Sequence, residues 1–292
     1  MQQLLLDKED IKKIKQSVIS IAGIGGIGSF AFEFLIRNGF QNFKIADLDT
    51  YDYSNIRQLF VTQETVGHKK IDVALKRALD INPKLNIETY KEGINVDNFK
   101  KFCLGSNVIC AQTDRITSQL LLYLGAQVNK LPLLHAGRAK WPNKHLVTVS
   151  FYDYRNGGGI FNFSSLGINP IGWGVHNINQ LEQFTKNILN GISCPQLINK
   201  IDNDNFEYKR KSFIEEIKQG DTSLISEKSR DYLLKIAKKF PNNFYKMAIT
   251  PELCSVSGAL ITTAIKDILL DRSVNNMAID LYNGKLFEKY KS

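Results

Sequence analysis

The feature that most constrains the fold is an apolar run that leads directly into a cluster of glycines. Residues 17–22 read SVISIA, and GIGGIG follows at once at residues 23–28. A short β-branched run of this kind is typical of a strand that is buried on both faces. Residues 29–38 then carry apolar side chains at helical spacing and end beside Gly39. The segment therefore predicts a strand, a tight glycine turn and a helix.

The same alternation of strand and helix continues through the first half of the chain. Strands separated by helices of this length form βαβ units, and such units build a mainly parallel sheet. We therefore expect an α/β protein with a doubly wound, Rossmann-like sheet. The patterns predict further strands at residues 43–46, 85–90, 107–111 and 131–135, and helices at residues 67–82 and 116–129.

The second half departs from this pattern. Residues 145–152 alternate like an exposed or antiparallel strand, and residues 253–270 form a mostly apolar helical pattern. An Asn-Gly pair at residues 283–284 between two short β-runs favours an antiparallel hairpin. We predict three regions: an α/β domain over residues 1–154, a helical insertion over 155–250, and a helix and hairpin over 251–292 that return to the main domain.

The composition is that of a folded chain with a basic excess. Of the 292 residues, 43% are hydrophobic, which suffices for a sizeable core and excludes overall disorder. Lys and Arg outnumber Asp and Glu by 38 to 29, giving a net charge of +9. This excess is compatible with nucleic acid, nucleotide phosphates, acidic proteins, a membrane surface, or a solvated lysine-rich surface without a special partner.

The cysteines and the first ten residues favour a cytoplasmic location. The four cysteines contain no CxxC pair, so neither a disulfide scaffold nor a four-thiolate zinc site is expected. Residues 1–10 carry three acids where a signal peptide would be basic and then apolar. Residues 17–36 hold four glycines and an acid, unlike a membrane span. We expect a cytoplasmic protein without structural zinc or a membrane partner.

The glycine cluster also predicts a ligand. Gly23, Gly25 and Gly28 form G-x-G-x-x-G in a strand-to-helix context, with Gly26 in the same loop, and Asp47 follows Gly28 by 19 residues. In this arrangement the backbone approaches a nucleotide, the helix N-terminus attracts phosphate, and the acid binds ribose hydroxyls. The motif alone leaves NAD, FAD and ATP open.

A downstream set of charged residues favours a triphosphate. Asp49, Asn55, Arg57 and Lys70 follow the second strand, and a guanidinium and an ammonium can grip phosphates from two sides. Hydride transfer by a dinucleotide-dependent enzyme does not need a pair of cations at the phosphates. Asp114 ends a third strand and is a candidate ligand for magnesium. Each residue alone could equally be a surface charge or a helix cap, but together they indicate a site.

At these residues the sequence resembles the ubiquitin-activating enzyme superfamily, in its bacterial ThiF/MoeB/HesA branch of adenylyltransferases. The convincing similarity covers roughly the first 150 residues. A fainter match lies in the C-terminal helix, at SGAL and AIKDIL. The matching stretches are GIGGIGS at residues 23–29, ADLDTYDYSNIRQ at 46–58, VGHKK at 66–70, INP at 81–83 and TD at 113–114.

The resemblance implies an enzyme that uses ATP and magnesium to adenylate a carboxylate. In the family the carboxylate usually ends a small ubiquitin-like sulfur carrier or a short peptide, pyrophosphate is released, and the enzyme is a homodimer. Carried over, Asp47 binds ribose, Asn55 and Arg57 bind phosphates, Lys70 binds phosphates on both sides of the scissile bond, and Asp114 binds magnesium. The expected nucleotide-binding set is Gly23, Gly25, Gly26, Gly28, Asp47, Asp49, Asn55, Arg57 and Lys70.

The chain departs from the family pattern at several points. Only Ile56 separates Asn55 from Arg57, where the family commonly has two residues. The two CxxC pairs that hold zinc in many relatives are absent, and residues 1–17 contain lysines but no arginine to reach across a dimer. Cys194, in GISCP, is the only cysteine of the insertion and is the candidate nucleophile for a thioester, although a lone cysteine beside proline in a helical region is more often structural or incidental.

We therefore expect catalytic roles for Arg57, Lys70, Asp114 and Cys194, with the insertion determining the substrate. Two other functions stay open. One is an RNA-directed relative similar to the threonylcarbamoyladenosine dehydratases, which adenylate a carboxylate carried on tRNA; the positive charge suits that partner, though it does not by itself favour nucleic acid. The other is a dinucleotide-dependent oxidoreductase, which would leave the charged set without a role. A binding-only subunit with a degenerate site is a further alternative.

Overall fold

The computed structural model describes residues 6–56, 58–95, 97–141, 144–155, 250–274, 277–280 and 285–288. Three sequence predictions lie outside the described residues: Arg57, Cys194 and the helices expected within the insertion.

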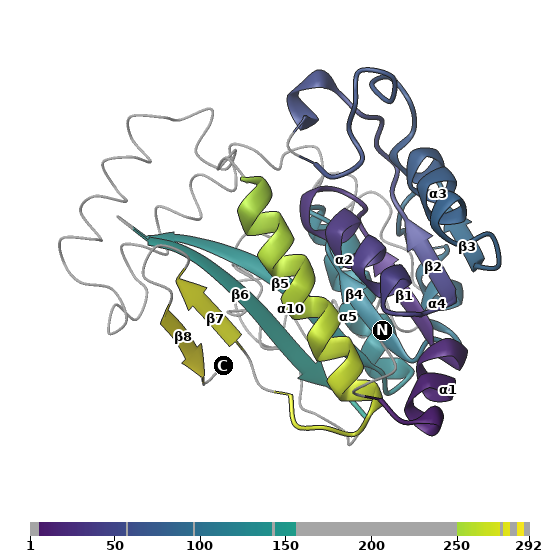
Figure 1. Ribbon diagram of the computed structural model, residues 1–292, viewed down its shortest axis with the longest axis vertical. Coiled ribbons are helices and arrows are strands. Elements are labelled where there is room, and N and C mark those ends of the chain that lie inside the picture. The colour runs from purple at the N-terminus through teal and green to yellow at the C-terminus, as the bar shows by residue number, and fades with distance from the viewer. Residues whose placement is uncertain are drawn as a thin grey trace. The chain divides into compact units, whose positions relative to one another are not determined.

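The described strands form an eight-stranded sheet in the order β3-β2-β1-β4-β5-β6-β7-β8 (Figure 1). Strands β1 to β5 pair in parallel, and β7 and β8 form the expected antiparallel hairpin. The predicted α/β, mainly parallel Rossmann-like fold is therefore confirmed. The strands are β1 Val18–Ala22, β2 Asn42–Ala46, β3 Asn86–Tyr90, β4 Val108–Ala111, β5 Pro132–Trp141, β6 Lys144–Asp153, β7 Met277–Asp280 and β8 Lys285–Glu288.

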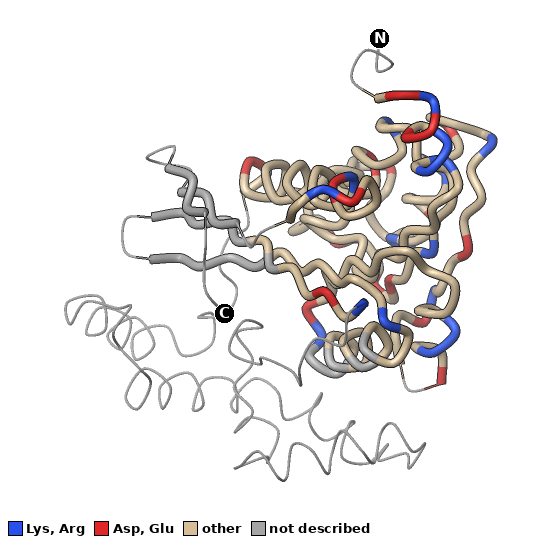
Figure 2. The backbone as a smooth tube through the Cα atoms, turned by 90° about the horizontal axis from the view of Figure 1, so that it is seen from below, with Lys and Arg blue, Asp and Glu red and all other residues tan. Residues whose placement is uncertain are grey.

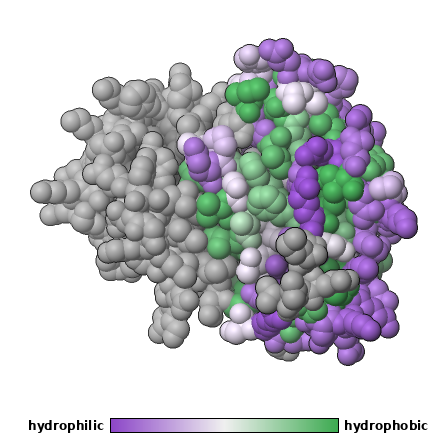
Figure 3. Space-filling model, in the orientation of Figure 1, coloured by the Kyte–Doolittle hydropathy of each residue, from purple (hydrophilic) through white to green (hydrophobic). Residues whose placement is uncertain are grey.

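Helices lie on both faces of the sheet. In Figure 1, α2 and α10 lie side by side in front of the sheet, and α5 lies behind it. Helix α3 packs beside α2, and α4 packs against α5. Figure 3 shows hydrophobic residues on the face formed by α2 and α10, crossed by a hydrophilic band, with further hydrophilic residues along the edge of this face near α1 and α3. The helices are α1 Lys8–Gln16, α2 Gly26–Arg37, α3 Lys70–Ile81, α4 Phe99–Cys103, α5 Ile116–Val128 and α10 Pro251–Leu269, with a 3-10 turn, η2, at Tyr53–Asn55.

Two helices were not expected from the sequence. Helix α1 begins after Asp7, whose side chain accepts a hydrogen bond from the backbone of Asp10 at 2.8 Å, and Ile14 is buried. The acids in its first turn and the lysines in its last turn match the helix dipole. The early acids thus cap α1 and fill its first turn. The other unexpected helix, α4, has only five residues, too few for a periodic signal.

Several predicted boundaries were wrong. Helix α2 begins at Gly26 rather than at residue 29, because the end of the glycine motif already forms the first helical turn. Helix α3 begins at Lys70 rather than at residue 67, since Gly67 has a φ of +88° and belongs to a turn. Strand β5 continues to Trp141, well past the predicted end at residue 135, because it runs alongside β6.

The contacts divide the chain into two compact units. The first unit contains residues 1–138, 147–160 and 249–291, and the second contains residues 139–146 and 161–248. Strands β1 to β4 and helix α10 therefore belong to one unit. Among the described helices, none combines the length and apolar character needed to cross a membrane.

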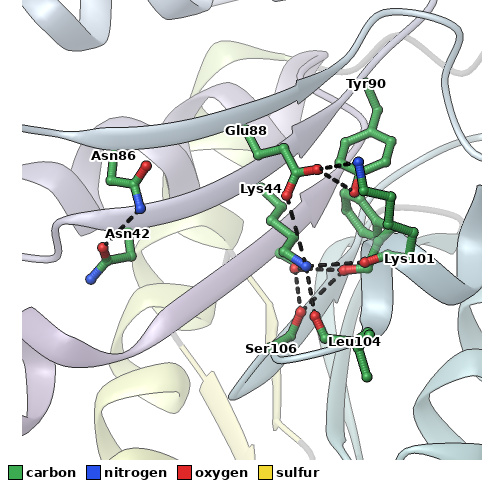
Figure 4. A network of polar contacts seen from close by, with 10 residues as sticks. Asn42, Lys44, Asn86, Glu88, Tyr90, Lys101, Leu104 and Ser106 are labelled. Atoms are coloured by element: carbon green, nitrogen blue, oxygen red, sulfur yellow. Dashed lines mark hydrogen bonds and ion pairs between the residues drawn. The ribbon is translucent and has the colours of Figure 1, made fainter.

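A polar network fixes β2 and β3 to the end of α4 (Figure 4). The ammonium of Lys44 donates to the carbonyl oxygens of Lys101 at 3.0 Å and Leu104 at 2.6 Å, where a helix C-terminus favours a cation. Glu88 accepts from the Tyr90 hydroxyl at 2.9 Å and pairs with Lys101 at 3.0 Å. These side chains have satisfied partners, and the network serves to hold α4 against the sheet.

Helices α2 and α10 are in close contact at Gly258. A Cβ at Gly258 would lie 2.6 Å from the Cβ of Phe30 and 2.9 Å from the backbone nitrogen of Ala31. Glycine is therefore required here by packing, although the position is helical.

We predict that Gly258→Val lowers the free energy of unfolding by about 1–3 kcal/mol, because the added side chain overpacks the contact with α2. Ala259→Val is the matched control, since Ala259 is exposed on the same helix and should lose only about 0.5 kcal/mol of helix propensity. Urea denaturation measures both. Equal losses in the two variants would contradict the close packing.

Helices α2 and α3 are also joined by an ion-pair cluster. Glu33 is almost fully buried and accepts hydrogen bonds from Arg37 at 2.8 Å and from Arg77 at 3.1 Å. Burial alone would raise the pKa of Glu33, but the hydrogen bonds and charges of Arg77 and Arg37 outweigh it and hold the pKa below its ordinary value. Ionised Glu33 therefore stabilises the folded state.

The lowered pKa has a predictable consequence for stability. Because the folded-state pKa lies below the unfolded value of about 4.3, the contribution of Glu33 is complete above that pH and is lost as the pH falls through the folded-state pKa. We expect Glu33→Gln to lose about 1 kcal/mol at neutral pH and to show a shallower acid decline than the parent chain. Glu9→Gln, an exposed change on α1, is the control. Parallel acid profiles for parent and Glu33→Gln in urea titrations would disprove this role.

Candidate functional site

The loops that follow β1, β2 and β4 meet at one edge of the sheet. Ala22 pairs with both Ala46 and Ala111, so the three strands end at the same level. The backbone of Gly23 donates to Ala46 at 2.7 Å, and that of Gln112 donates to Ala22 at 2.7 Å. Figure 1 shows the chain between β2 and α3 rising over the end of the sheet at which α2 begins. The carboxyl ends of parallel strands are where such folds bind ligands.

The glycines of the motif differ in whether the surrounding chain leaves room for a side chain. Gly23 has a φ of +92°, and a Cβ there would lie 2.5 Å from the carbonyl oxygen of Gln112. A Cβ at Gly28 would lie 1.8 Å from the carbonyl oxygen of Gly23. A Cβ at Gly25, in contrast, would meet only the side chain of Gln58, at 3.9 Å. Chain packing therefore explains Gly23 and Gly28, whereas a Cβ at Gly25 would make only ordinary contact with the Gln58 side chain.

Gly25 is the residue before the first turn of α2. It has no side chain to cap the helix, and the buried Gly26 follows as the first helical residue. The backbone N–H groups of a first helical turn lack partners within the helix, and the helix dipole makes this end attractive to anions. Gly25 thus adjoins a helix N-terminus that can accept a phosphate group.

Asp47 connects the glycine loop to the chain after β2. One carboxylate oxygen accepts from the backbone of Ile24 at 2.7 Å, and the other accepts from the backbone of Asp49 at 2.9 Å. Burial raises the pKa of Asp47, while the charge of Lys70 and these two amides oppose the rise. Each oxygen keeps a further lone pair, so a ribose hydroxyl could still be bound. Asp47 therefore also has a structural role that the sequence did not show.

Lys70 is the first residue of α3 and is paired with Asp49. Its ammonium lies 2.9 Å from Asp49 Oδ2, and its side chain is only 8% exposed, against 53% for Asp49. The backbone of Lys70 also donates to Asp49 at 3.0 Å. A cation at a helix N-terminus is disfavoured by the dipole. Two neighbouring carboxylates, those of Asp49 and Asp47, offset this cost.

The next segment carries Asn55 on the 3-10 turn η2. The side-chain oxygen of Asn55 accepts from the backbone of Asp52 at 3.1 Å, and Asp52 accepts from the backbone of Ser54 at 2.8 Å. Asn55 therefore helps to cap this turn, in addition to any contact with a ligand. Gln58 follows, and its buried side-chain oxygen has no hydrogen-bond partner.

Asp114 lies on an exposed turn beyond β4. The turn is held by Thr113, which accepts through its hydroxyl from the backbone of Arg115 at 3.3 Å and through its carbonyl from the side chain of Gln119. Within the described residues, no group of three or more His, Cys, Asp or Glu could hold a metal by itself. Mg²⁺ at nucleotide sites is usually held by one or two carboxylates and the phosphates, so the carboxylate of Asp114 fits such an ion.

The sequence did not point to Tyr51 or Gln58. The backbone of Tyr51 donates to His68 at 2.9 Å and accepts from Gly67 at 2.9 Å, so this stretch pairs with the chain just before α3. The Tyr51 ring lies beneath the ammonium of Lys70, 5.9 Å from it, and its buried hydroxyl has no partner. Buried polar atoms normally have partners. Among the described residues, three buried atoms without a hydrogen-bond partner, in Tyr51, Gln58 and Gln112, lie in the loops of this site.

The cysteines of the described residues are buried. Burial raises the pKa of the Cys103 and Cys110 thiols to about 12, which makes thiolate formation unfavourable at neutral pH. Both thiols lie in the core, and Cys254 is buried as well.

We predict that Lys70→Met raises the pKa of Asp47 further, because it removes the positive charge that opposes the effect of burial. The titration of Asp47 can be followed by ¹³C NMR of its carboxyl carbon. Lys76→Met is the matched control, because Lys76 lies on the same helix and pairs with Asp80 in the solvent. An unchanged Asp47 titration in Lys70→Met would show that the ammonium does not act on this carboxylate.

The chain is similar to curated proteins over its first part. It is 31% identical over 134 residues to the tRNA threonylcarbamoyladenosine dehydratase of Bacillus subtilis (strain 168), covering 45% of this chain and 53% of that protein. It is 37% identical over 99 residues to ubiquitin-like modifier-activating enzyme 5 of Oryza sativa subsp. japonica, covering 34% of this chain and 23% of that protein. The chain thus spans about half the length of the first relative and about a quarter of the second.

Solved structures share the fold over most of the chain. Escherichia coli MccB, solved with MccA-N7isoASN, has a TM-score of 0.61 at 13% identity, covering 96% of this chain and 66% of MccB. PaaA has a TM-score of 0.59 at 14% identity, covering 96% of this chain and 65% of PaaA. At these identities the likeness shows the fold alone. The ThiF family profile matches residues 1–161, more than half of the 292 residues, and the chain therefore belongs to the ThiF family.

Proposed function

We propose that this chain binds ATP with magnesium and transfers its adenylyl group to a carboxylate, with release of pyrophosphate. The observation that carries the proposal is the nearly buried ammonium of Lys70 at the start of α3, held by Asp49 close to Asp47 of the glycine loop. This arrangement keeps a cation where the fold otherwise disfavours one. A polyphosphate is the ligand that would benefit from it, and membership of the ThiF family supports ATP.

The residues suggest how the nucleotide is bound. The N-terminus of α2, next to Gly25, would take a phosphate group, and Asp47 would bind the ribose. Lys70, and by proposal Arg57 and Asn55, would contact the remaining phosphates. Asp114 would hold Mg²⁺, which when bound neutralises phosphate charge.

The reaction needs charge stabilisation more than a strong base. A carboxylate oxygen of the substrate attacks the α-phosphorus of ATP, the bond to the bridging oxygen breaks, and pyrophosphate leaves with the electron pair. The ammonium of Lys70 would offset the negative charge that grows on this leaving group. The acyl-adenylate that forms has AMP as a good leaving group, so a nucleophile can attack it later.

The proposed acceptor is the C-terminal carboxylate of a small protein or peptide. The similarity to ubiquitin-like modifier-activating enzymes supports this class. We further propose that the region 155–250 selects the acceptor. Most of this region, residues 161–248, belongs to the second of the two compact units, which is consistent with a separate role. The homodimer, the cytoplasmic location and a thioester at Cys194 stay predictions from the sequence.

A carboxylate carried on tRNA is the second candidate. The 31% identity to the Bacillus subtilis tRNA dehydratase favours it. The charge pattern favours it less, because Figure 2 shows basic and acidic residues interspersed along the described chain. RNA binding usually requires a continuous basic surface. A dinucleotide oxidoreductase is not proposed, since it would leave Lys70 and Asp114 without a role.

We expect Lys70→Met to weaken the binding of MgATP about 10- to 100-fold, as measured by calorimetry, because a charge-assisted contact to phosphate is lost. Lys76→Met should bind like the parent chain. Saturable NADH binding by a parent chain that does not bind MgATP would overturn the proposed function.

Exchange of labelled pyrophosphate into ATP tests the chemical step and distinguishes the acceptors. Exchange that depends on a peptide or small-protein fraction would support the first candidate, and exchange that depends on a tRNA fraction would support the second. Asp114→Ala should abolish exchange in either case while the thermal unfolding stays cooperative. Unchanged exchange in Asp114→Ala would exclude the magnesium role.

A further inference from the structure

Tyr51 is a buried residue whose backbone is fixed and whose hydroxyl is not used. The residue is 2% exposed, and its two backbone hydrogen bonds, to His68 and Gly67, are both 2.9 Å long. The hydroxyl is buried and has no hydrogen-bond partner. The folded chain therefore holds a donor in place without satisfying it, which costs stability.

Two residues of the proposed nucleotide site act on Tyr51. The ammonium of Lys70 is 5.9 Å from the centre of the Tyr51 ring. Burial, and then the negative charge of Asp47, raise the pKa of the Tyr51 hydroxyl far above its ordinary value. The hydroxyl is therefore a neutral hydrogen-bond donor over the whole physiological pH range. It belongs to a residue close to those proposed to bind the ribose and the phosphates.

We propose that the Tyr51 hydroxyl is a nucleotide-binding donor that completes its hydrogen bond with an oxygen of bound ATP. The inference rests on the proposed function and extends it to a residue outside the expected set. Lys70 lies over the ring and is held by Asp49, whose carboxylate is half exposed. Phosphates would compete with this carboxylate for the ammonium, so a nucleotide bound at Lys70 would also change the surroundings of the Tyr51 ring. Tyr51 then positions the nucleotide relative to Lys70.

The chain contains a natural control for this interpretation. The ring of Tyr90 also lies beneath a lysine ammonium, that of Lys101, at 5.9 Å. Its hydroxyl, however, donates to Glu88 at 2.9 Å, within the network that joins β3 to α4 (Figure 4). Tyr51 and Tyr90 thus share the cation over the ring and differ in whether the hydroxyl has a partner.

The test compares Tyr51→Phe with Tyr90→Phe in the full chain, because each change removes one oxygen and keeps the ring. Without nucleotide, Tyr51→Phe should raise the melting temperature by about 2–4 °C, since an unsatisfied buried hydroxyl is removed. Its affinity for MgATP, measured by calorimetry, should fall about five- to fifteen-fold because the hydrogen bond to the ligand is lost. Tyr90→Phe should melt at a lower temperature and bind MgATP within twofold of the parent chain.

The opposite signs of the two effects separate binding from structure. Unchanged MgATP affinity in Tyr51→Phe would overturn the inference, whatever its melting temperature. A lower melting temperature in Tyr51→Phe would overturn it too, because the hydroxyl would then already have a partner in the free protein. A parent chain that does not bind MgATP would instead refute the proposed function itself.

Discussion

The rest of the site depends on the two hydrogen bonds that the carboxylate of Asp47 accepts from the backbone. Its two oxygens accept from the backbone of Ile24 in the glycine loop and of Asp49 after β2. These bonds fix the start of α2 relative to the segment that carries Asp49, and Asp49 in turn holds Lys70. One buried acid thereby sets the relative positions of a helix N-terminus and a cation, the two elements that can bind phosphate.

The site is also a compromise between stability and binding. Lys70 lies at the end of α3 that repels cations, Asp47 is an acid whose pKa is raised by burial, and Tyr51 has a hydroxyl without a partner. Each feature costs stability in the free chain. An anionic, oxygen-rich ligand would offset at least the cost of the Lys70 cation and that of the Tyr51 hydroxyl. Elsewhere, the buried Glu33 and the partly buried Lys44 each have more than one hydrogen-bond partner.

Much of the fold followed from local patterns. The run before Gly23, the glycine spacing and Asp47 were enough to predict the first βαβ unit, because period and turn chemistry are encoded over short stretches. The short helix α4 gave no periodic signal, and α1 was missed although its cap and charge gradient are local. The start of α3 was placed too early, because a glycine turn precedes Lys70 and only the structure shows its φ of +88°.

The sequence by itself determined the α/β class, the glycine loop and the residue types of the site, since each depends on neighbours within a few residues. The tertiary structure decided which of them act together. Gly23 and Gly28 are required by packing, whereas a Cβ at Gly25 would meet only the side chain of Gln58; Gln112, which crowds Gly23, and Gln58 both come from other loops. Tyr51 meets Lys70 because the stretch after β2 pairs with the stretch before α3. Contacts between segments so far apart arise only when the strands align and their carboxyl ends meet at one edge.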